Sequence, residues 1–147
     1  MKKVRNILEA KGSNEHNVFS VDPSTIVYSA IETMAQKNIG GVLICENGKL
    51  VGIFTERDYA RKLILKGKSS KDTPIGDLMT KNPFTVTVES TIEECMQLMS
   101  DRRIRHLPVL DMEGKLSGVI SIGDVVRFII EEQKMTIAHL ESYIAGQ

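Results

Sequence analysis

The 147-residue sequence contains no tryptophan, three tyrosines and four phenylalanines, so aromatic residues make up only 5% of the chain. Single-stranded nucleic acid is bound largely by stacking of bases on aromatic side chains along a basic groove. The chain also lacks a net charge, because 19 lysines and arginines balance 19 aspartates and glutamates. No overall field therefore attracts phosphate backbones or anionic lipids. These absences argue against a nucleic-acid-binding or membrane-surface protein.

Long apolar runs are also missing, although a membrane-spanning helix needs about 18 or more consecutive apolar residues. The basic start of the chain is interrupted by Glu9 and Lys11 before any apolar stretch long enough for a signal peptide. Cys45 and Cys95 have neither a CxxC spacing nor neighbouring histidines, so we expect two reduced thiols at apolar positions. Together these features predict a cytoplasmic protein without a membrane span.

What the sequence does contain is an internal repeat. Residues 18–44 align with residues 83–109, and residues 48–64 align with residues 114–130. A duplication is the simplest explanation. In the second pair of segments these residues have identical counterparts: Gly48, Lys49, Leu50, Gly52, Asp58, Arg61 and Ile64.

The first helix of each copy is predicted to be amphipathic. Apolar residues spaced i, i+3, i+4 and i+7 predict one helix from Val27 onward and an equivalent helix from Ile92 onward. Ser90 and Glu93 have the spacing of a capping box at the start of the second of these helices.

A β-hairpin and another helix follow in each copy. The apolar runs GGVLIC and KLVGIF, and their counterparts HLPVL and KLSGVI, are separated by short turns that contain glycine. Helices are then expected over 57–66, closing on Gly67, and over 123–144. The predicted fold is therefore α/β (α+β), with two β-α-β-β-α repeats. One such unit is too small to bury both faces of its sheet, so we expect the two to pack together and share a core.

The repeat defines the domain organisation. We expect a single module over 1–147, in which repeat 1 spans 15–68 and repeat 2 spans 80–135. Residues 69–79 form a polar linker with a short helical turn. Residues 136–147 extend the last helix beyond the repeat.

That extension predicts a homodimer. An apolar overhang more often packs against a partner or its own core than stands free in solvent. The apolar residues available for its stripe are Ile130, Met135, Ile137, Leu140 and Ile144.

The motifs GIFTERD at 52–58 and GVISIGD at 118–124 share a glycine, apolar residues, a Thr or Ser, and an Asp three residues later. NIGGVLI and RIRHLPVL precede them. With these motifs in order over about 15–135, the chain resembles a stand-alone tandem pair of cystathionine β-synthase (CBS) domains, called a Bateman module. The resemblance implies two CBS repeats packed with pseudo-twofold symmetry and two clefts between them.

The resemblance also implies an adenosine-containing ligand: AMP, ADP, ATP, NAD(H) or S-adenosylmethionine, with Mg²⁺ as a candidate companion and no required cofactor. In the family the motif hydroxyl contacts phosphate and the Asp binds the ribose hydroxyls. These roles fall on Thr55 with Asp58 and on Ser121 with Asp124. The adenine side would be lined by Val21, Val86, the stretch Ile39, Gly40, Gly41 and Val42, and the stretch from Ile104 to Pro108, in which Arg105 stands near the phosphates.

The same motifs have a second interpretation, since a hydroxyl and an early Asp also cap ordinary helices. A helix start with free N–H groups nevertheless accepts a phosphate, so the two interpretations are compatible. Arg57, which the second motif replaces with Gly123, is either a phosphate ligand or a solvated side chain. His106 is more often a satisfied strand histidine than a phosphate ligand.

These observations favour a regulatory module that binds an adenine nucleotide between its repeats and signals to a second copy or an unidentified regulated protein by conformational or oligomeric change. The alternative is a structural interaction module with empty clefts. We expect no enzyme, because no nucleophile with its base, no catalytic residue and no metal motif can be identified among the widely spaced histidines.

Overall fold

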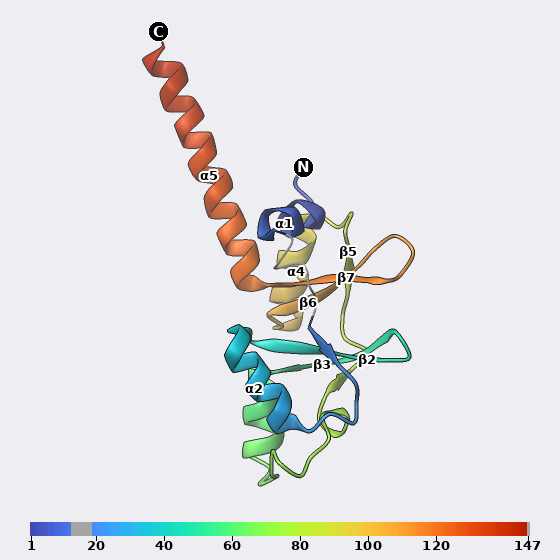
Figure 1. Cartoon of the computed structure of the whole chain (residues 1–147). Coiled ribbons are helices and arrows are strands. Elements are labelled where there is room, and N and C mark those ends of the chain that lie inside the picture. Colours follow the sequence, from blue (N-terminus) through green and yellow to red (C-terminus); the bar gives the residue numbers. More distant parts are fainter. Residues whose placement is uncertain (13–18, 147) are drawn as a thin grey trace.

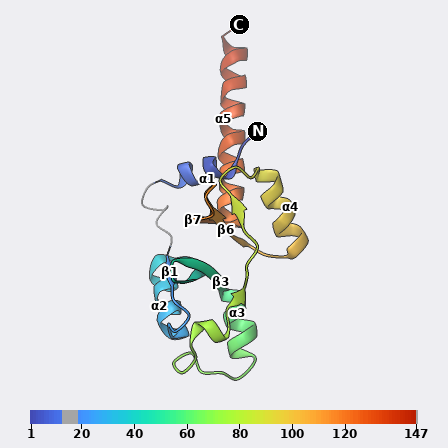
Figure 2. The same ribbon diagram turned by 90° about the vertical axis from the view of Figure 1, so that its right-hand side faces the viewer.

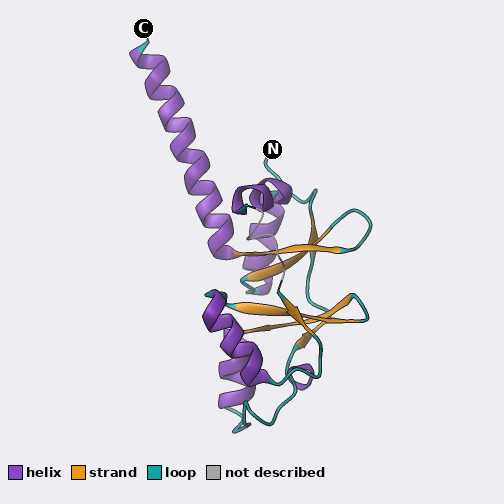
Figure 3. Cartoon of the chain, viewed as in Figure 1, coloured by secondary structure: helices purple, strands orange, loops and turns teal. Residues whose placement is uncertain are grey.

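The computed structural model describes residues 1–12 and 19–146 and contains two β-sheets with helices on their outer faces (Figure 1, Figure 3). The predicted start of repeat 1, at residue 15, and the last residue of the chain lie outside the described residues. The first sheet has the strand order β1 (Ser20–Val21), β2 (Gly41–Glu46), β3 (Lys49–Thr55) and β4 (Thr80–Lys81). The second sheet has the order β5 (Val86–Thr87), β6 (His106–Leu110) and β7 (Leu116–Ser121).

The two repeats have the same order of elements, which confirms the predicted mixed α/β fold of two β-α-β-β-α units. In each, a short strand runs parallel to the first hairpin strand, and the hairpin itself is antiparallel. The helices of the first repeat are α2 (Val27–Lys37) and α3 (Glu56–Asp58), which continues as η1 (Tyr59–Ile64). Those of the second repeat are α4 (Ile92–Arg102) and α5 (Ile122–Ala145).

The helix after the first hairpin is less regular than predicted. Its second part, η1, is π-helical, because the N–H of Leu65 donates to the carbonyl of Ala60 at 3.1 Å and that of Lys68 to Leu63 at 3.0 Å. It ends near Gly67, which adopts a φ of 67°. The predicted stop at this glycine agrees with its left-handed conformation.

The start of α4 differs from the predicted capping box. Thr91 caps the helix, since its Oγ1 accepts the N–H of Glu94 at 3.1 Å. The hydroxyl of Ser90 instead accepts the N–H of Thr87 at 3.0 Å and closes the preceding turn. The box of Ser90 and Glu93 is therefore wrong, because the helix begins one residue later than the pattern suggested.

The expectation of one shared core is also wrong. Each sheet packs its helix-facing side against its own helices, so the structure has two separate clusters of buried residues. Figure 1 shows the two hairpins next to each other, with α2 on one outer side and α4 on the other. Successive strand residues point to opposite faces. Leu43, Ile53 and Pro108, which are buried but belong to neither cluster, therefore lie on the faces where the sheets meet.

A segment from outside each repeat completes its core. The helix α1 (Val4–Lys11), which the sequence analysis did not predict, buries Val4, Ile7 and Leu8 against the second repeat. The 3-10 helix η2 (Ile75–Asp77), the predicted short turn, lies at the corresponding place on the first repeat, where Ile75 is buried. The correspondence extends to the backbone, because Lys3 bridges to Thr91 as Pro74 bridges to Ile26.

The first glycine of each motif lies beneath this covering segment. A Cβ on Gly52 would overlap the side chain of Met79 and lie 3.1 Å from the carbonyl oxygen of Thr80. A Cβ on Gly118 would lie 3.0 Å from Cδ2 of Leu8. Both glycines therefore allow the close approach of a segment that covers the sheet.

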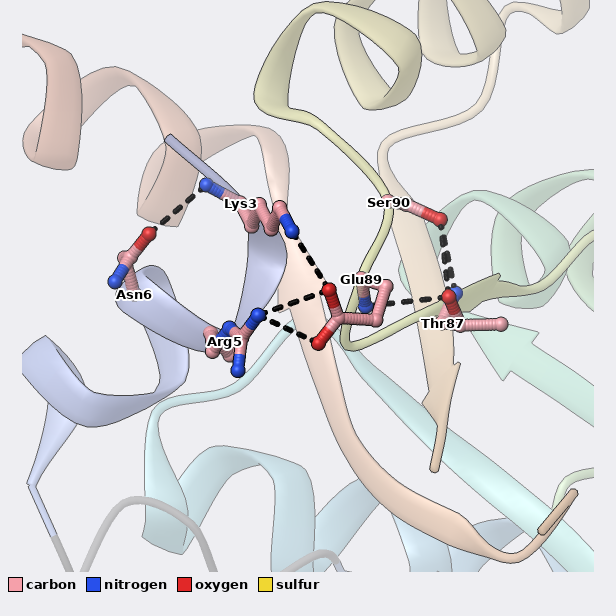
Figure 4. Close-up of polar contacts among 6 residues, drawn as sticks. All are labelled: Lys3, Arg5, Asn6, Thr87, Glu89 and Ser90. Atoms are coloured by element: carbon pink, nitrogen blue, oxygen red, sulfur yellow. Dashed lines mark hydrogen bonds and ion pairs between the residues drawn. The ribbon is translucent and has the colours of Figure 1, made fainter. Parts of the chain in front are cut away.

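Polar contacts fix α1 to the loop before α4 (Figure 4). The Lys3 ammonium donates to Oε2 of Glu89 at 2.7 Å, and the Arg5 guanidinium lies 2.6 Å from Oε1 of the same carboxylate. The N–H of Lys3 donates to the side chain of Asn6 at 2.9 Å.

The helix α5 projects well beyond the second repeat, and the chain ends far from both sheets (Figure 1, Figure 2). Among the described residues, no helix is both long and apolar enough to cross a membrane.

Candidate functional site

A cleft of about 1000 Å³ opens between the motif of the first repeat and the second repeat. Its walls come from the start of α3, from the loop that joins β4 to β5, and from the turn between α4 and β6. The lining residues are Gly40, Ile53, Thr55, Glu56, Arg57, Asp58, Arg61, Thr80, Lys81, Asn82, Pro83, Phe84, Arg102, Arg103, Ile104, Arg105 and His106. The structure thus brings together seven predicted site residues: Gly40, Thr55, Arg57, Asp58, Ile104, Arg105 and His106.

Thr55 and Asp58 form a reciprocal cap at the point where β3 passes into α3. The N–H of Thr55 donates to Oδ2 of Asp58 at 2.9 Å, and the N–H of Asp58 donates to Oγ1 of Thr55 at 3.3 Å. The second carboxylate oxygen, Oδ1, lies 3.4 Å from both the Thr80 hydroxyl and the Lys62 ammonium. These last two contacts are long, so Oδ1 is the more weakly held acceptor at the rim of the cleft.

The charge of this cleft departs from that of the whole chain. Two acidic residues, Glu56 and Asp58, face a larger set of permanently charged cations. In a protein of zero formal charge, this local excess makes the cleft attractive to an anion. The lining cations are Arg57, Arg61, Lys81, Arg102, Arg103 and Arg105.

Two of the arginines make defined contacts across the cleft walls. Nη1 of Arg57 donates to the carbonyl oxygen of Arg103 at 2.9 Å and so joins the first repeat to the second. Arg103 occupies the left-handed C-cap of α4, with a φ of 55°, which turns its carbonyl toward the motif. The guanidinium of Arg102 lies over the ring of Phe84, 4.7 Å from its centroid, which orients both side chains.

His106 fills the space that two glycines leave at the junction of the sheets. Its Nε2 would lie 3.3 Å from a Cβ on Gly40, and its Cδ2 would lie 3.6 Å from a Cβ on Gly41. Burial lowers the pKa of His106 below the usual value, despite the opposing field of Asp124. The imidazole is therefore neutral at pH 7 and contributes shape and hydrogen-bonding capacity to the cleft, not positive charge.

The second motif is built like the first but has different neighbours. The N–H of Ser121 donates to Oδ2 of Asp124 at 2.9 Å, and the N–H of Asp124 donates to Oγ of Ser121 at 3.1 Å. The Lys11 ammonium donates to the same Oδ2 at 3.0 Å, and Arg127 donates to Oδ1 at 2.6 Å. Burial alone would raise the pKa of Asp124, but the bonds from Ser121 and Lys11 outweigh it and hold the pKa below its usual value.

The remaining predicted site residues lie outside the lining of this cleft. The side chains of Val42 and Val86 are buried in the two cores, and those of Val21 and Ile39 pack against the first core. Pro108 is buried in β6. A ligand near these positions would meet backbone groups in place of their side chains. Gly41 lies against Thr55 and His106.

The two motifs by themselves do not indicate most of the cations that line the cleft. Arg102 and Arg103 stand in the charged run DRRIRH, but only the left-handed turn at the end of α4 places them beside the first motif. Lys81 and Phe84 come from TKNPF, the segment just before the second copy. Lysines and arginines clustered in these two segments were the available signal.

No group of three or more metal-ligating side chains occurs within residues 1–12 and 19–146. Cys95 is buried, and burial raises the pKa of its thiol to about 11, so it carries no reactive thiolate at neutral pH.

Comparison with known proteins places this geometry in a family. The family model of the CBS domain matches residues 14–65 and 75–131. The chain belongs to the CBS domain family. Its CBS pair is 46% identical over 125 residues to CBSX3, a mitochondrial CBS domain-containing protein of Arabidopsis thaliana. That alignment covers 82% of this chain and 60% of CBSX3, so the relative has a substantial additional part.

Solved CBS structures have the same fold. A CBS-domain protein from Burkholderia ambifaria superposes with a TM-score of 0.85 at 45% identity, covering 90% of this chain and 96% of that one. CBSX2, solved in complex with AMP, superposes with a TM-score of 0.72 at 30% identity, covering 90% of this chain and 99% of that one. The chain therefore contains a pair of CBS domains, a Bateman module.

Proposed function

We propose that this CBS pair is a regulatory module that binds an adenine nucleotide in the cleft of about 1000 Å³ between its repeats. The observation that carries the proposal is the excess of cations in that cleft, next to the Thr55 and Asp58 pair. The AMP complex of CBSX2 supports the ligand class, since that protein has the same fold over most of this chain.

The two parts of a nucleotide match different parts of the cleft. Asp58 presents carboxylate oxygens, and Oδ1 has only contacts of 3.4 Å to displace, so it suits the paired hydroxyls of a ribose. Arg61 and Arg105 offer guanidinium donors for phosphate oxygens, which they can bind with two parallel hydrogen bonds. Phe84 is 45% exposed and provides an aromatic surface for the base.

The contact between Arg57 and Arg103 offers a route from binding to signal. A phosphate would compete with the Arg103 carbonyl for the guanidinium of Arg57. Losing that 2.9 Å bond would loosen one link between the repeats, and a ligand shifts such an equilibrium only if it binds one arrangement better. The receiver of the change would be a second copy of the chain or an unidentified regulated protein.

The test is isothermal titration of the purified chain with AMP, ADP, ATP, NADH and S-adenosylmethionine, each with Mg²⁺ and with EDTA. Asp58→Asn should weaken binding at least tenfold while the unfolding temperature stays close to that of the unchanged protein. Asp72→Asn, an exposed carboxylate outside the cleft lining, is the matched control and should bind normally.

If none of the five ligands binds or stabilises the fold at millimolar concentration, the nucleotide proposal is wrong. The chain would then be a structural interaction module with empty clefts. Equal loss of affinity in Asp58→Asn and Asp72→Asn would place the ligand outside the proposed cleft.

A further inference from the structure

The second motif has the same reciprocal cap as the first but a different set of charged neighbours. Because the internal repeat relates Asp124 to Asp58, a ligand held by the first motif has an equivalent place at the second. Ribose hydroxyls need carboxylate oxygens with acceptor sites still free. Both oxygens of Asp124 already accept a bond from a cation, Oδ2 from Lys11 at 3.0 Å and Oδ1 from Arg127 at 2.6 Å. The second carboxylate is therefore occupied by side chains of its own chain.

Lys11 is held at Asp124 by two hydrogen bonds in a place with little water. Its ammonium also donates to the carbonyl oxygen of Val119, at 3.0 Å, in the strand that leads into the motif. The side chains of Lys11 and Asp124 are only 19% and 9% exposed. A ribose that displaced the ammonium would leave a largely buried cation without either acceptor, which is costly. A bond between two charged groups is also stronger than one from a neutral hydroxyl, so the lysine is the favoured partner of Asp124.

The helix that carries Lys11 is itself fixed. The apolar face of α1 is buried in the second core. At the other end of this helix, two cations bind the carboxylate of Glu89 (Figure 4), and the N–H of Val4 donates to the carbonyl oxygen of Ser90 at 2.9 Å. The backbone of Lys11, the last residue of α1, is therefore anchored. While α1 stays in place, Asp124 is freed only if the lysine side chain turns away.

The covering segment of the first repeat places a different residue at the equivalent position. Leu8 in α1 and Met79 after η2 lie over the first glycine of their respective motifs. Three residues further along, the chain has Lys11 in one segment and Asn82 in the other. Asn82 lines the cleft of the first repeat and carries no charge. The same position therefore leaves the first motif open and supplies the cation that covers the carboxylate of the second.

The arginine that follows each motif also has a different place in the two repeats. The repeat aligns Arg127 with Arg61. In the regular helix α5, Arg127 lies three residues after Asp124 and bonds to it, whereas Arg61 belongs to the π-helical η1 and lines the first cleft. Arg127 is 72% exposed, so it can turn toward an incoming phosphate. Lys11, and not Arg127, is therefore the residue that blocks the second carboxylate.

We propose that Lys11 closes the second motif to ribose, so that each chain binds one nucleotide, at the first motif. The inference rests on the proposed function, because it assigns that nucleotide to one of two related sites. Asp124 then serves the fold, since its carboxylate ties the end of α1 to the start of α5. The two halves of the duplication thus have different roles, a ligand site in the first repeat and an anchor for α1 in the second.

Binding stoichiometry tests the closure. Equilibrium dialysis of the full chain with AMP and, separately, with ATP, up to millimolar concentration, should give one nucleotide per chain. Lys11→Asn, which copies the residue of the first repeat, should bind two. Lys11→Arg keeps the cation and should stay at one, and so should Lys115→Asn, a control at a lysine whose side chain is 78% exposed.

Double variants locate the second ligand. Adding Asp124→Asn to Lys11→Asn removes the freed carboxylate, so the stoichiometry should return to one. Adding Asp58→Asn to Lys11→Asn should instead remove the first ligand and retain the second. Circular dichroism and thermal unfolding show whether each variant is folded at the temperature of the dialysis, and the unchanged chain decides the stoichiometry even if a variant fails to fold.

The possible outcomes separate this inference from the proposed function. Two nucleotides per unchanged chain would overturn the closure and leave the proposed function intact. A folded Lys11→Asn that still binds one would overturn the role of Lys11. No binding by the unchanged chain would overturn the proposed function instead. In that case a nucleotide that binds only Lys11→Asn would still support the closure, and no binding by either protein would overturn it.

Discussion

The ammonium of Lys11 lies 3.0 Å from Oδ2 of Asp124 and 3.0 Å from the carbonyl oxygen of Val119. The two side chains are 19% and 9% exposed, so this ion pair between α1 and the second motif is largely removed from water. In the first motif, Asp58 has only the longer contacts to Thr80 and Lys62 on its outer oxygen. The two motifs therefore share a cap but differ in how firmly the carboxylate is held.

Lys11→Met should reduce the free energy of unfolding by about 1–3 kcal/mol, the usual cost of losing a hydrogen bond between charged groups. The pKa of Asp124 is lowered by its partners, so its contribution to stability is present at neutral pH and is lost as pH falls below about 4. Without Lys11, that pKa moves back toward its usual value, so the loss of stability between neutral and acid pH should be smaller in the variant than in the unchanged protein. Urea titrations from pH 3 to 7 measure both effects.

Lys115→Met provides the control for this experiment, since Lys115 and its partner Glu113 are both 78% exposed. This variant should show the same decrease in the free energy of unfolding between pH 7 and pH 3 as the unchanged protein. If the free energy of unfolding of Lys11→Met decreased with falling pH as steeply as that of the unchanged protein, the ion pair would not be what holds Asp124 in its charged form.

His106 predicts a second pH effect, near neutrality. Burial lowers its pKa in the folded protein, so the unfolded chain takes up a proton more readily and stability should decrease as pH falls below about 6.5. His106→Gln should remove this dependence between pH 7.5 and 5.5, as measured by thermal unfolding. An unchanged slope in the variant would assign the effect to another group.

Gly52 should not tolerate a side chain while Met79 lies over it. Gly52→Ala should destabilise the protein by about 1–3 kcal/mol, the usual cost of overpacking a core. Shortening the covering side chain with Met79→Ala should recover part of that loss in the double variant. Chemical denaturation of both single variants and the double variant measures the coupling, and purely additive effects would contradict the close contact.

The cation excess predicts a preference among nucleotides. ATP should bind more tightly than AMP, and Arg61→Gln with Arg105→Gln should reduce ATP affinity at least tenfold, as expected for lost charge-assisted hydrogen bonds. Titration at low and high salt should show a stronger salt dependence for ATP than for AMP. Lys115→Gln, outside the cleft, is the control, and equal affinity for AMP and ATP would contradict the electrostatic argument.

The fold class and the order of elements could be predicted from the sequence, because the repeat is visible in aligned residues such as Gly52 and Asp58. The motif also located Thr55 and Asp58 at a helix start, since the strand before them and the cap are both local patterns. α1 could have been found as well, because Val4, Ile7 and Leu8 have helical spacing and match the covering residues from Ile75 to Met79.

Contacts between distant segments could not be predicted in this way. Lys11 and Asp124 are far apart in the chain, and nothing local to either residue indicates that they meet. The position of Arg103 depends on a left-handed turn at the end of α4, and the bond from Arg57 depends on how the repeats pack. Such features follow from the tertiary arrangement and not from periodicity.

The exchange of covering segments has a consequence for unfolding. The segment before the first repeat covers the core of the second repeat with Val4, Ile7 and Leu8. The segment before the second repeat covers the core of the first repeat with Ile75. Unfolding of either repeat would therefore expose buried apolar side chains of the other, even though the two hydrophobic cores are separate. The pair should therefore behave as a single cooperative unit, like a domain-swapped dimer whose two subunits have been joined into one chain.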